Sequence, residues 1–336
     1  MKTAQGSWEK FDDYVVDFAL EAATAGKRFA LVTLVRIEGA SPRALGAQMA
    51  VTEDGEWVGY LSGGCLERTI VTEAINTIEA GRSRRLRFGE GSPYFDIQLP
   101  CGSALELYFD VEQGRQDLET VQAALADRHE AVLAFEDRDE KTASDICFRI
   151  GYLPRRRLIV LGTGPVAVLL CRLASAAGFE VELFTNDEPT LIFGREAGAA
   201  GALLSSPRRL PDLRIDRRSA VAFLFHDHDW EEELLPVVLG SDAFYIGAIG
   251  SRKTHDRRVQ NLKERGLADA AIARIHGPAG IFGGSKSAAD IALSILSQIV
   301  QLDPHGRDDR LDEVPRDAAR RTARLPVTSA YQGPTP

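Results

Sequence analysis

Apolar residues in the first 150 positions recur with two spacings, which together predict a mixture of helices and strands. From residue 8 to about residue 25 the spacing is helical, whereas the continuous apolar run at 29–35 is typical of a buried strand. Glycines and polar clusters separate these runs. We expect strands at 29–35, 48–52, 57–61, 104–109, 131–135 and 145–150, and helices at 8–25, 66–80 and 116–127.

The pattern changes near residue 151, after which apolar strands alternate with helical stretches. This alternation predicts an α/β domain with a doubly wound parallel sheet, which binds ligands beyond the carboxyl ends of its strands. We therefore predict an N-terminal α+β domain, a Rossmann-like domain and a polar tail with little fixed structure. Their expected limits are 1–150, 151–302 and 303–336.

A glycine fingerprint, G-x-G-x-x-A, occupies residues 162–167 between the first strand and the first helix of the second domain. In that context the amides of Gly162, Thr163 and Gly164 are suited to a pyrophosphate at a helix N-terminus. NAD-binding domains carry an acidic residue at the end of the next strand, where this chain has Thr185, and Asp187 follows. This order disfavours ordinary NAD binding and leaves NADP, another nucleotide, or a turn without a nucleotide open.

Two polar segments follow the later strands of this domain. His226-Asp227-His228-Asp229 could form a metal site, act as an acid–base pair, contact a ligand or cap the loop. Histidines two residues apart point to opposite sides of an extended chain, which disfavours a shared metal. Ser251, Arg252 and Lys253 suit an anionic ligand, which we favour over a plain helix start with Ser251 as N-cap.

Two of the four cysteines lie beside glycines and are the candidate reactive groups. The turn Ser62-Gly63-Gly64-Cys65 joins a strand to a helix, and a helix N-terminus attracts anions and favours a thiolate. Cys65 therefore suits a phosphorylated ligand with affinity for sulfur, although a tight turn with a small apolar residue explains the pattern equally well. Cys101 lies in a second such turn, whereas Cys147 and Cys171 fall within apolar elements and are expected to pack.

Length, net charge, apolar runs and cysteine spacing argue against several classes of protein. A length of 336 residues fits two domains, and a net charge of −9 argues against general affinity for nucleic acid. Because no apolar run approaches the roughly 20 residues of a membrane span and the first residues lack a signal-peptide core, we expect a cytoplasmic protein that does not enter the membrane. The cysteines show no paired ligand spacing, which disfavours disulfides and a zinc site.

Taken in order, these motifs resemble the xanthine dehydrogenase accessory proteins of the XdhC/CoxI type. The resemblance spans roughly residues 10–300, and its N-terminal motifs are the most specific part. The segments that carry it are GASPRALGAQM at 39–49, GYLSGGCLE at 59–67, PCG at 100–102, GTGPVA at 162–167, HDH at 226–228, YIGAIGSRK at 245–253 and ADIA at 289–292.

The resemblance implies a non-catalytic maturation factor that binds molybdenum cofactor (molybdopterin), protects it while a cysteine desulfurase supplies the sulfido ligand, and inserts it into a molybdenum hydroxylase of the xanthine or CO dehydrogenase type. It implies Cys65 and Cys101 near the molybdenum, with Ser62, Gly63 and Gly64 shaping the turn. Arg43 would hold a phosphate, and Glu67 would cap its helix. The expected partners are the apo-enzyme, the desulfurase and a second copy of the chain.

The chain also departs from the family pattern. Phe282 stands where the family tends to have an acidic residue, and Ser103 replaces a glycine after Cys101-Gly102. Two alternatives remain beside the chaperone. One is an NAD(P)-dependent oxidoreductase for a small carbonyl or alcohol, with His226 or His228 as proton donor, and the other is a nucleotide-sensing module that recruits a desulfurase.

Overall fold

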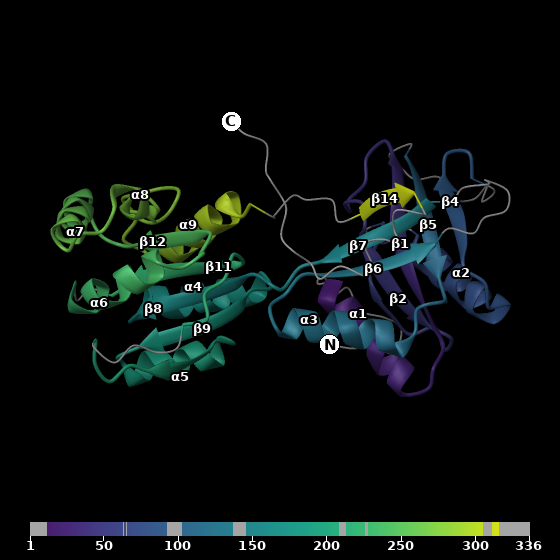
Figure 1. The fold of residues 1–336 in the computed structure, drawn as a ribbon, viewed down its shortest axis with the longest axis horizontal. Helices are drawn as coiled ribbons and strands as arrows, with labels where there is room; N and C mark the ends of the chain where they lie inside the picture. Colours follow the sequence, from purple (N-terminus) through teal and green to yellow (C-terminus); the bar gives the residue numbers. More distant parts are fainter. Residues whose placement is uncertain are drawn as a thin grey trace. The chain divides into compact units, whose positions relative to one another are not determined.

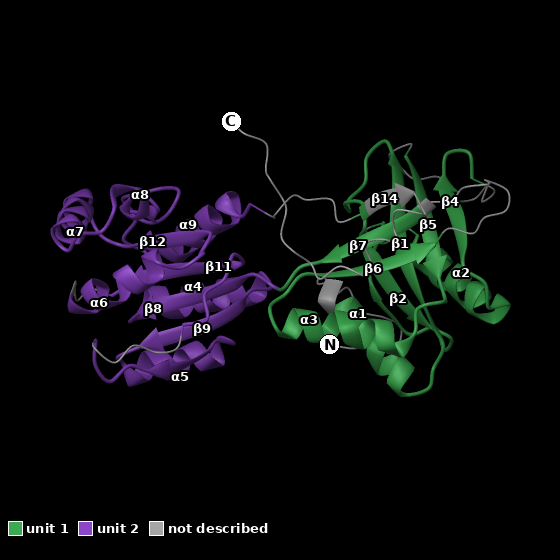
Figure 2. Cartoon of the chain, viewed as in Figure 1, with its two compact units in different colours: residues 1–154, 309–336 green, residues 155–308 purple. Residues whose placement is uncertain are grey.

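The structure, a computed structural model, describes residues 12–62, 64, 66–92, 103–136, 146–207, 213–225, 228–304 and 311–315. The chain forms two compact units (Figure 2). Unit 1 comprises residues 1–154 and 309–336, and unit 2 comprises residues 155–308. The division therefore falls between Pro154 and Arg155, and the C-terminal segment belongs to the first unit.

Unit 1 is built on a five-stranded antiparallel sheet (Figure 1). Its strands are β1 (Phe29–Glu38), β2 (Gln48–Thr52), β3 (Trp57–Gly59), β4 (Arg84–Gly89) and β5 (Ala104–Asp110), in the order β3-β2-β1-β5-β4. The central strand β1 is apolar because both of its faces are covered. Val32 and Leu34 join the core under helix α2 (Glu67–Ala80), whereas Leu31 and Val35 join the core under α1 (Asp12–Thr24) and α3 (Arg115–Ala126).

A second sheet of unit 1 has three strands, β6 (Ala131–Glu136), β7 (Ile146–Tyr152) and β14 (Leu311–Pro315), with β7 in the middle. Leu311 lies opposite Ile150 in the antiparallel pair of β14 and β7. Strand β14 falls within the polar tail for which the sequence predicted little fixed structure. Its hydrogen-bonding partner lies about half the chain away in sequence, so local composition does not reveal the strand.

Unit 2 is a parallel, doubly wound α/β fold, as predicted. Its strands are β8 (Arg157–Gly162), β9 (Glu180–Thr185), β10 (Ala200–Leu203), β11 (Ser219–Leu224), β12 (Tyr245–Ala248) and β13 (Ile275–His276). The sheet order is β10-β9-β8-β11-β12-β13, which is the arrangement of a dinucleotide-binding Rossmann domain. The strand order reverses between β8 and β11, where this fold places its ligands.

Helices cover both faces of the unit 2 sheet (Figure 1). The core of one face includes residues of α4 (Pro165–Ala176) and α9 (Ala288–Leu302), and α5 (Glu188–Glu196) packs beside α4. The core of the other face includes residues of α6 (His228–Leu239), α7 (Arg252–Glu264) and α8 (Asp269–Ile272). In the described part of the chain, no helix combines the length and the apolar character that a membrane crossing requires.

Candidate functional site

The turn between β3 and α2 is organised around one buried carboxylate, that of Glu67, which is only 3% exposed. Its Oε1 accepts hydrogen bonds from the amides of Leu61 (3.2 Å) and Ser62 (2.9 Å). Its Oε2 accepts from the Ser62 hydroxyl (2.6 Å) and from the Gly64 amide (2.9 Å). Four donors therefore converge on this carboxylate, and it fixes the backbone on both sides of residue 63.

Ser62 completes this network from inside the turn. Its Oγ accepts a hydrogen bond from the Leu66 amide (2.9 Å) while its proton goes to Glu67. Gly64 has φ +120°, a conformation that residues with a Cβ rarely adopt, so the second glycine of the motif is a backbone requirement. Gly63, Cys65 and Cys101, which the sequence singled out, lie outside the described residues.

The loop before β2 is joined to the same region of unit 1 through two contacts. The guanidinium of Arg43 lies over the ring of Tyr60, 4.6 Å from its centroid, and Tyr60 directly precedes the glycine turn. The Ala40 amide donates to the Ser103 hydroxyl at 3.0 Å, and a Cβ on Gly39 would stand 2.9 Å from that oxygen. The loop at 39–43, the turn at 60–66 and the segment beginning at Ser103 therefore lie together.

Ser103 thus has a structural explanation. It is 1% exposed, and its hydroxyl satisfies the Ala40 amide, which a glycine at position 103 could not do. In the sequence this serine stands out only as a departure from the family pattern. This role could have been inferred from the position of the serine beside a glycine turn, because serine hydroxyls often hydrogen-bond to backbone amides.

In unit 2, the glycine fingerprint takes the expected position between β8 and α4. A Cβ on Gly162 would lie 2.5 Å from the Cβ of Leu224 on β11, so only glycine permits this approach of the two strands. Gly164 has φ +82° and is the N-cap residue of α4. Thr163 lies between them, so the three predicted residues form one turn at the carboxyl end of β8.

The Gly164 amide, however, already has a partner within the protein. It donates to the Thr190 hydroxyl at 3.0 Å, and Thr190 in turn donates to Asp187 Oδ2 at 2.5 Å. Asp187 also accepts from the Thr190 amide at 2.9 Å and thereby caps α5. These hydrogen bonds from Thr190 lower the pKa of the Asp187 carboxyl. Asp187 thus acts as a helix cap here, and Thr190, which sequence analysis overlooked, links it to the glycine turn.

The segments after β11 and β12 are described only in part. His226 and Asp227 lie outside the described residues, and residue 228 begins helix α6. Ser251 caps α7, since its side chain accepts from the Thr254 amide at 3.1 Å. The N-cap alternative for Ser251 is thus observed, while the exposed side chains of Arg252 and Lys253 extend from the first turn of the same helix.

Within each unit the predicted residues come together to different degrees. In unit 1, Arg43, Ser62 and Gly64 belong to the linked loops described above. In unit 2, β8, β11 and β12 are neighbouring parallel strands, so the loops after them share one sheet edge.

Cys147 and Cys171 are buried as predicted, and burial raises the pKa of Cys171 to about 12. The described residues include no cluster of three metal-ligating side chains, and both candidate metal ligands lie outside them.

Fold and motifs together define a protein with an α+β unit that carries a glycine-cysteine turn and a second unit of the Rossmann type. The chain belongs to the XdhC and CoxI family. The model of that family matches residues 22–89, and the model of the XdhC Rossmann domain matches residues 158–299.

Three known proteins illustrate the relationship. The chain is 34% identical to the molybdenum cofactor insertion chaperone PaoD of Escherichia coli, over 89% of this chain and 91% of the relative. It is 21% identical to a Bacillus subtilis protein named as a probable xanthine dehydrogenase subunit, over 81% of this chain and 92% of the relative. A solved xanthine dehydrogenase structure from Bacillus halodurans shares the fold, with a TM-score of 0.68 at 22% identity, covering 87% of this chain and 98% of that one.

Proposed function

We propose that this protein is a chaperone that binds molybdenum cofactor and inserts it into a molybdenum hydroxylase of the xanthine or CO dehydrogenase type. The similarity to an insertion chaperone over almost the full length of both chains supports this function. The relative named as a probable xanthine dehydrogenase component is consistent with a client enzyme of this type.

The observation that carries the proposal is the clustering of three separate loops in unit 1. The Ala40–Ser103 hydrogen bond joins the first loop to the segment that follows Cys101, and the Arg43–Tyr60 contact joins it to the turn that contains Cys65. Segments about 20 and 60 residues apart in sequence are therefore brought to one place. A site assembled from loops on a rigid sheet is typical of ligand binding.

The chemistry of these loops suits the cargo. Molybdenum cofactor holds its metal through a dithiolene and carries a phosphate, so it needs soft ligands or soft contacts at one end and cationic groups or amides at the other. Cys65 and Cys101 provide thiols next to residues that the structure places in this cluster. Arg43 provides a guanidinium suited to a phosphate, held beside Tyr60.

Glu67 is the positioning residue of this site. Its carboxylate fixes the Ser62 and Gly64 amides, and Ser62 fixes the Leu66 amide, so the chain is held on both sides of Cys65. A turn fixed in advance loses less conformational entropy when the cargo binds. Glu67 acts through the backbone and needs no contact with the cofactor.

The finer steps follow from the same proposal. While the cargo is bound, a cysteine desulfurase supplies persulfide sulfur that would replace a terminal oxo ligand; two thiols would provide the two electrons and two protons and become a disulfide, and the oxygen would leave as water. The apo-enzyme then receives the completed cofactor. A second copy of the chain forms a homodimer, and the Rossmann unit offers its sheet edge to NADP or to the nucleotide of a dinucleotide form of the cofactor.

The oxidoreductase alternative has less support. It requires the glycine turn to bind a pyrophosphate, yet the Gly164 amide is hydrogen-bonded to Thr190, and Asp187 is engaged in capping α5. A dinucleotide would have to displace this hydroxyl before it could use the amide. We therefore place the cargo site in unit 1.

The test is retention of molybdenum cofactor by the purified chain in anaerobic, reducing buffer, followed by transfer to an apo-hydroxylase. Bound molybdenum and pterin are measured after gel filtration. Wild type should retain both, and Cys65→Ser and Cys101→Ser should each lower retention about tenfold or more, since each removes a soft contact.

Cys171→Ala is the matched control, because this cysteine is fully buried in the other unit and the change leaves the unit 1 loops intact. It should retain the cofactor like wild type. Failure of wild type to hold the cofactor, or equal retention by all three variants, would contradict the proposal. The result of the retention test does not depend on whether the chain binds a nicotinamide nucleotide. Turnover of a carbonyl substrate with NADPH would favour the oxidoreductase.

A further inference from the structure

Unit 2 carries most of the exposed apolar side chains. Among the residues whose side chains the structure describes, ten large apolar ones are exposed, and nine of these lie in unit 2. They are Ile192, Phe193, Leu203, Val237, Ile281, Phe282, Leu293, Val300 and Leu302. Scattered apolar residues on a surface are ordinary, whereas a contiguous group of them marks a binding surface.

Helix α9 presents such a group on its outer side. A surface helix normally turns charged and polar residues to the solvent, yet α9 has one charged residue among fifteen, Asp290 in its first turn. Leu293, Ser297 and Val300 follow one another at spacings of four and three, so they lie along one side of the helix. Leu293 is 50% exposed and Val300 46%, while the opposite side of α9 lies in the core.

The loop after β13 extends this apolar stripe. The Ile281 amide donates to the Ser294 carbonyl at 3.3 Å, and the Phe282 amide donates to the Ser294 hydroxyl at 3.1 Å. These hydrogen bonds fix the loop beside the turn of α9 that presents Leu293, and the side chains of Ile281 and Phe282 are 51% and 47% exposed. The α9 face is defined here as Ile281, Phe282, Leu293, Ser297 and Val300.

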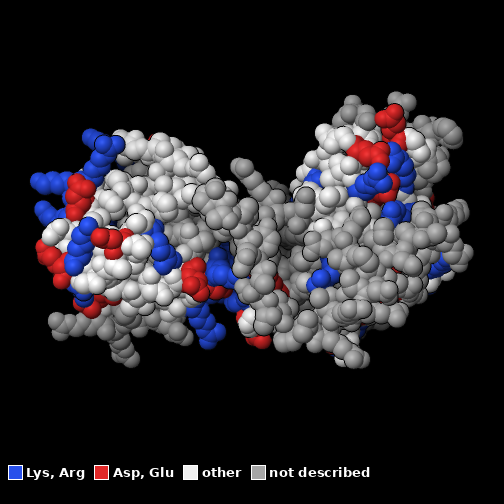
Figure 3. Space-filling model, turned by 45° about the horizontal axis from the view of Figure 1, so that its top comes forward, with Lys and Arg blue, Asp and Glu red and all other residues white. Residues whose placement is uncertain are grey.

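Few charges surround the α9 face. Phe282 itself stands where the family tends to have an acidic residue, so this chain lacks a charge there. Helix α4, which packs beside α9, has one charged residue, Arg172, and Lys286 precedes the N-cap residue of α9. Charged side chains gather at the end of unit 2 where α6 and α7 lie, whereas the surface over α9 is largely uncharged (Figure 3).

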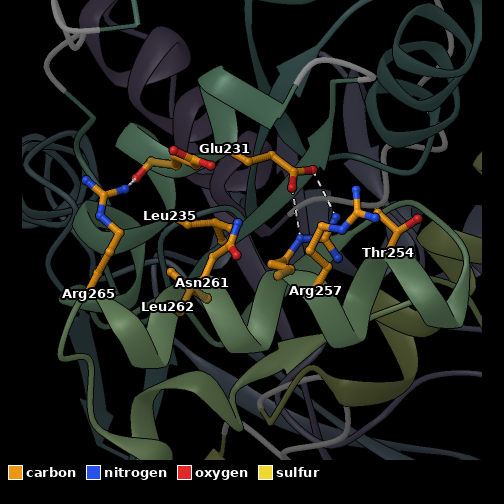
Figure 4. A pocket seen from close by; sticks show the side chains of 9 residues that line it. Glu231, Leu235, Thr254, Arg257, Asn261, Leu262 and Arg265 are labelled. Carbon is orange, nitrogen blue, oxygen red and sulfur yellow. Dashed lines mark hydrogen bonds and ion pairs between the residues drawn. The ribbon is translucent and has the colours of Figure 1, made fainter.

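The other face of the unit 2 sheet is closed by charged groups. A cavity of about 210 Å³ lies between α6 and α7, and Arg258 in its wall donates to both carboxylate oxygens of Glu231 at 2.9 and 3.0 Å (Figure 4). Helix α6 has four acidic residues, while residues 252–265 have six basic and two acidic ones, so the charges of the two helices balance. This side of unit 2 therefore offers a partner neither an apolar face nor a net charge.

We propose that the α9 face binds the same face of a second copy of this chain, in an isologous contact about a two-fold axis. The proposal goes beyond the homodimer stated above, because it assigns the residues of the contact, and it does not depend on the cargo. Ser297 is small and lies between two larger residues, Leu293 and Val300. The stripe therefore has a hollow that a large side chain of an antiparallel second copy fills, and two-fold symmetry repeats this fit.

The distribution of charge favours a second copy as the occupant. Unit 2 has 19 basic and 19 acidic residues, whereas unit 1 has 21 basic and 30 acidic ones and so carries the whole net charge of −9. A contact between two copies through unit 2 brings no net charge together, whereas a contact through unit 1 sets like charges against each other. A strongly charged partner gains no attraction from the net charge of unit 2.

The size of the α9 face agrees with this occupant. If a fully exposed side chain of this size presents roughly 150–200 Å², four half-exposed ones present about 300–400 Å². A standard interface buries about 800 Å² on each partner, and about 65% of a homodimer interface is apolar, which corresponds to about 500 Å². The partly buried Val166, Leu169 and Leu173 of α4 add apolar surface beside α9, so the area available approaches this value.

The test is the oligomeric state of the full chain without cofactor, measured by sedimentation equilibrium. Wild type should have twice the mass of the 36.7 kDa chain at micromolar concentration. Leu293→Arg and Val300→Arg should each raise the dimer dissociation constant about hundredfold or more, because each buries two unpaired like charges in the contact. Both residues are half exposed in a single copy, so the variants should keep the wild-type circular dichroism spectrum.

Val237→Arg is the matched control, because this valine is 47% exposed on helix α6, away from the α9 face. Its dissociation constant should stay within about twofold of wild type. A monomeric wild type, a dimeric Leu293→Arg or a monomeric Val237→Arg would each overturn the proposal. If Leu293→Arg stays dimeric but loses transfer to the apo-hydroxylase, the face belongs to the client enzyme instead.

The oligomeric state and cofactor retention are separate measurements, so the two proposals fail separately. A dimer that depends on Leu293 but does not retain molybdenum cofactor would contradict the proposed function and support the assigned contact. A monomer that retains the cofactor would do the reverse.

Discussion

Replacing Glu67 with glutamine tests the organisation of the glycine-cysteine turn most directly. The change keeps the size of the side chain but turns one carboxylate oxygen into an NH₂ group. Each oxygen of Glu67 accepts from two donors, so the new NH₂ must face either the Leu61 and Ser62 amides or the Ser62 hydroxyl and the Gly64 amide. Two hydrogen bonds are lost in either orientation, and donors then face donors.

The magnitude follows from this count. A hydrogen bond to a charged acceptor contributes about 1.5–3 kcal/mol, so two of them correspond to about 3–6 kcal/mol. Rotation of the Ser62 hydroxyl and entry of water recover part of this, and we expect the turn to lose about 3 kcal/mol of local stability. Since about 1.4 kcal/mol is a tenfold change, opening of the turn becomes about a hundredfold more frequent.

Hydrogen exchange followed by mass spectrometry measures this opening. Peptides that cover residues 61–66 should exchange about a hundredfold faster in Glu67→Gln, while those from β1 and β5 keep their protection. Glu79→Gln is the matched control, since it removes a carboxylate from the exposed end of the same helix. Exchange of 61–66 at the wild-type rate in Glu67→Gln would refute the assigned role of this carboxylate.

Three further predictions concern unit 2. Gly162→Ala should cost about 1–3 kcal/mol in urea unfolding because its Cβ would overlap the neighbouring strand, whereas Gly283→Ala, with open space around it, should change stability by less than about 0.5 kcal/mol. Arg258→Met should cost about 3–5 kcal/mol by leaving Glu231 buried without its partner, and adding Glu231→Leu should restore most of the loss. Because the folded pKa of Asp187 is lowered, its ionised form stabilises the fold above the ordinary pKa of 3.8, and this contribution disappears as pH falls through the folded value. The melting temperature of Asp187→Asn should therefore lie below that of wild type at pH 7, and the difference should shrink as the pH falls below the ordinary pKa of 3.8 and through the lower folded pKa.

The helices and strands that the sequence predicted well are those in which the spacing of apolar residues matches the faces that are buried. Strand β1 reads as continuously apolar because both of its faces are buried, and the run before Gly162 is followed by the turn and helix that its motif requires. Family resemblance likewise identified the chain correctly from its loop motifs. Local pattern and global fold agree at these positions.

The elements that were missed depend on partners distant in sequence. Strand β4 contains three arginines and reads as polar, yet Arg84 and Arg85 pair with Glu73 and Glu106, and the strand joins the sheet edge beside β5. Strand β14 pairs with β7, although the whole Rossmann unit separates the two strands in the sequence. Neither strand shows a periodic pattern of apolar residues in its own sequence. The acidic residues that pair with the β4 arginines, and the strand that pairs with β14, lie elsewhere in the chain.

The two glycine motifs illustrate opposite uses of the same local chemistry. In unit 1, Glu67 accepts hydrogen bonds from the Ser62 and Gly64 amides, so the backbone at these two positions is fixed before any ligand arrives. In unit 2, Thr190 occupies the Gly164 amide itself, so a ligand at that turn must compete with an internal hydrogen bond. A preformed turn lowers the entropic cost of binding, whereas an occupied amide raises the cost. This contrast supports the proposed cargo site in the α+β unit, whereas any ligand at the Rossmann edge would have to compete with Thr190 for the Gly164 amide.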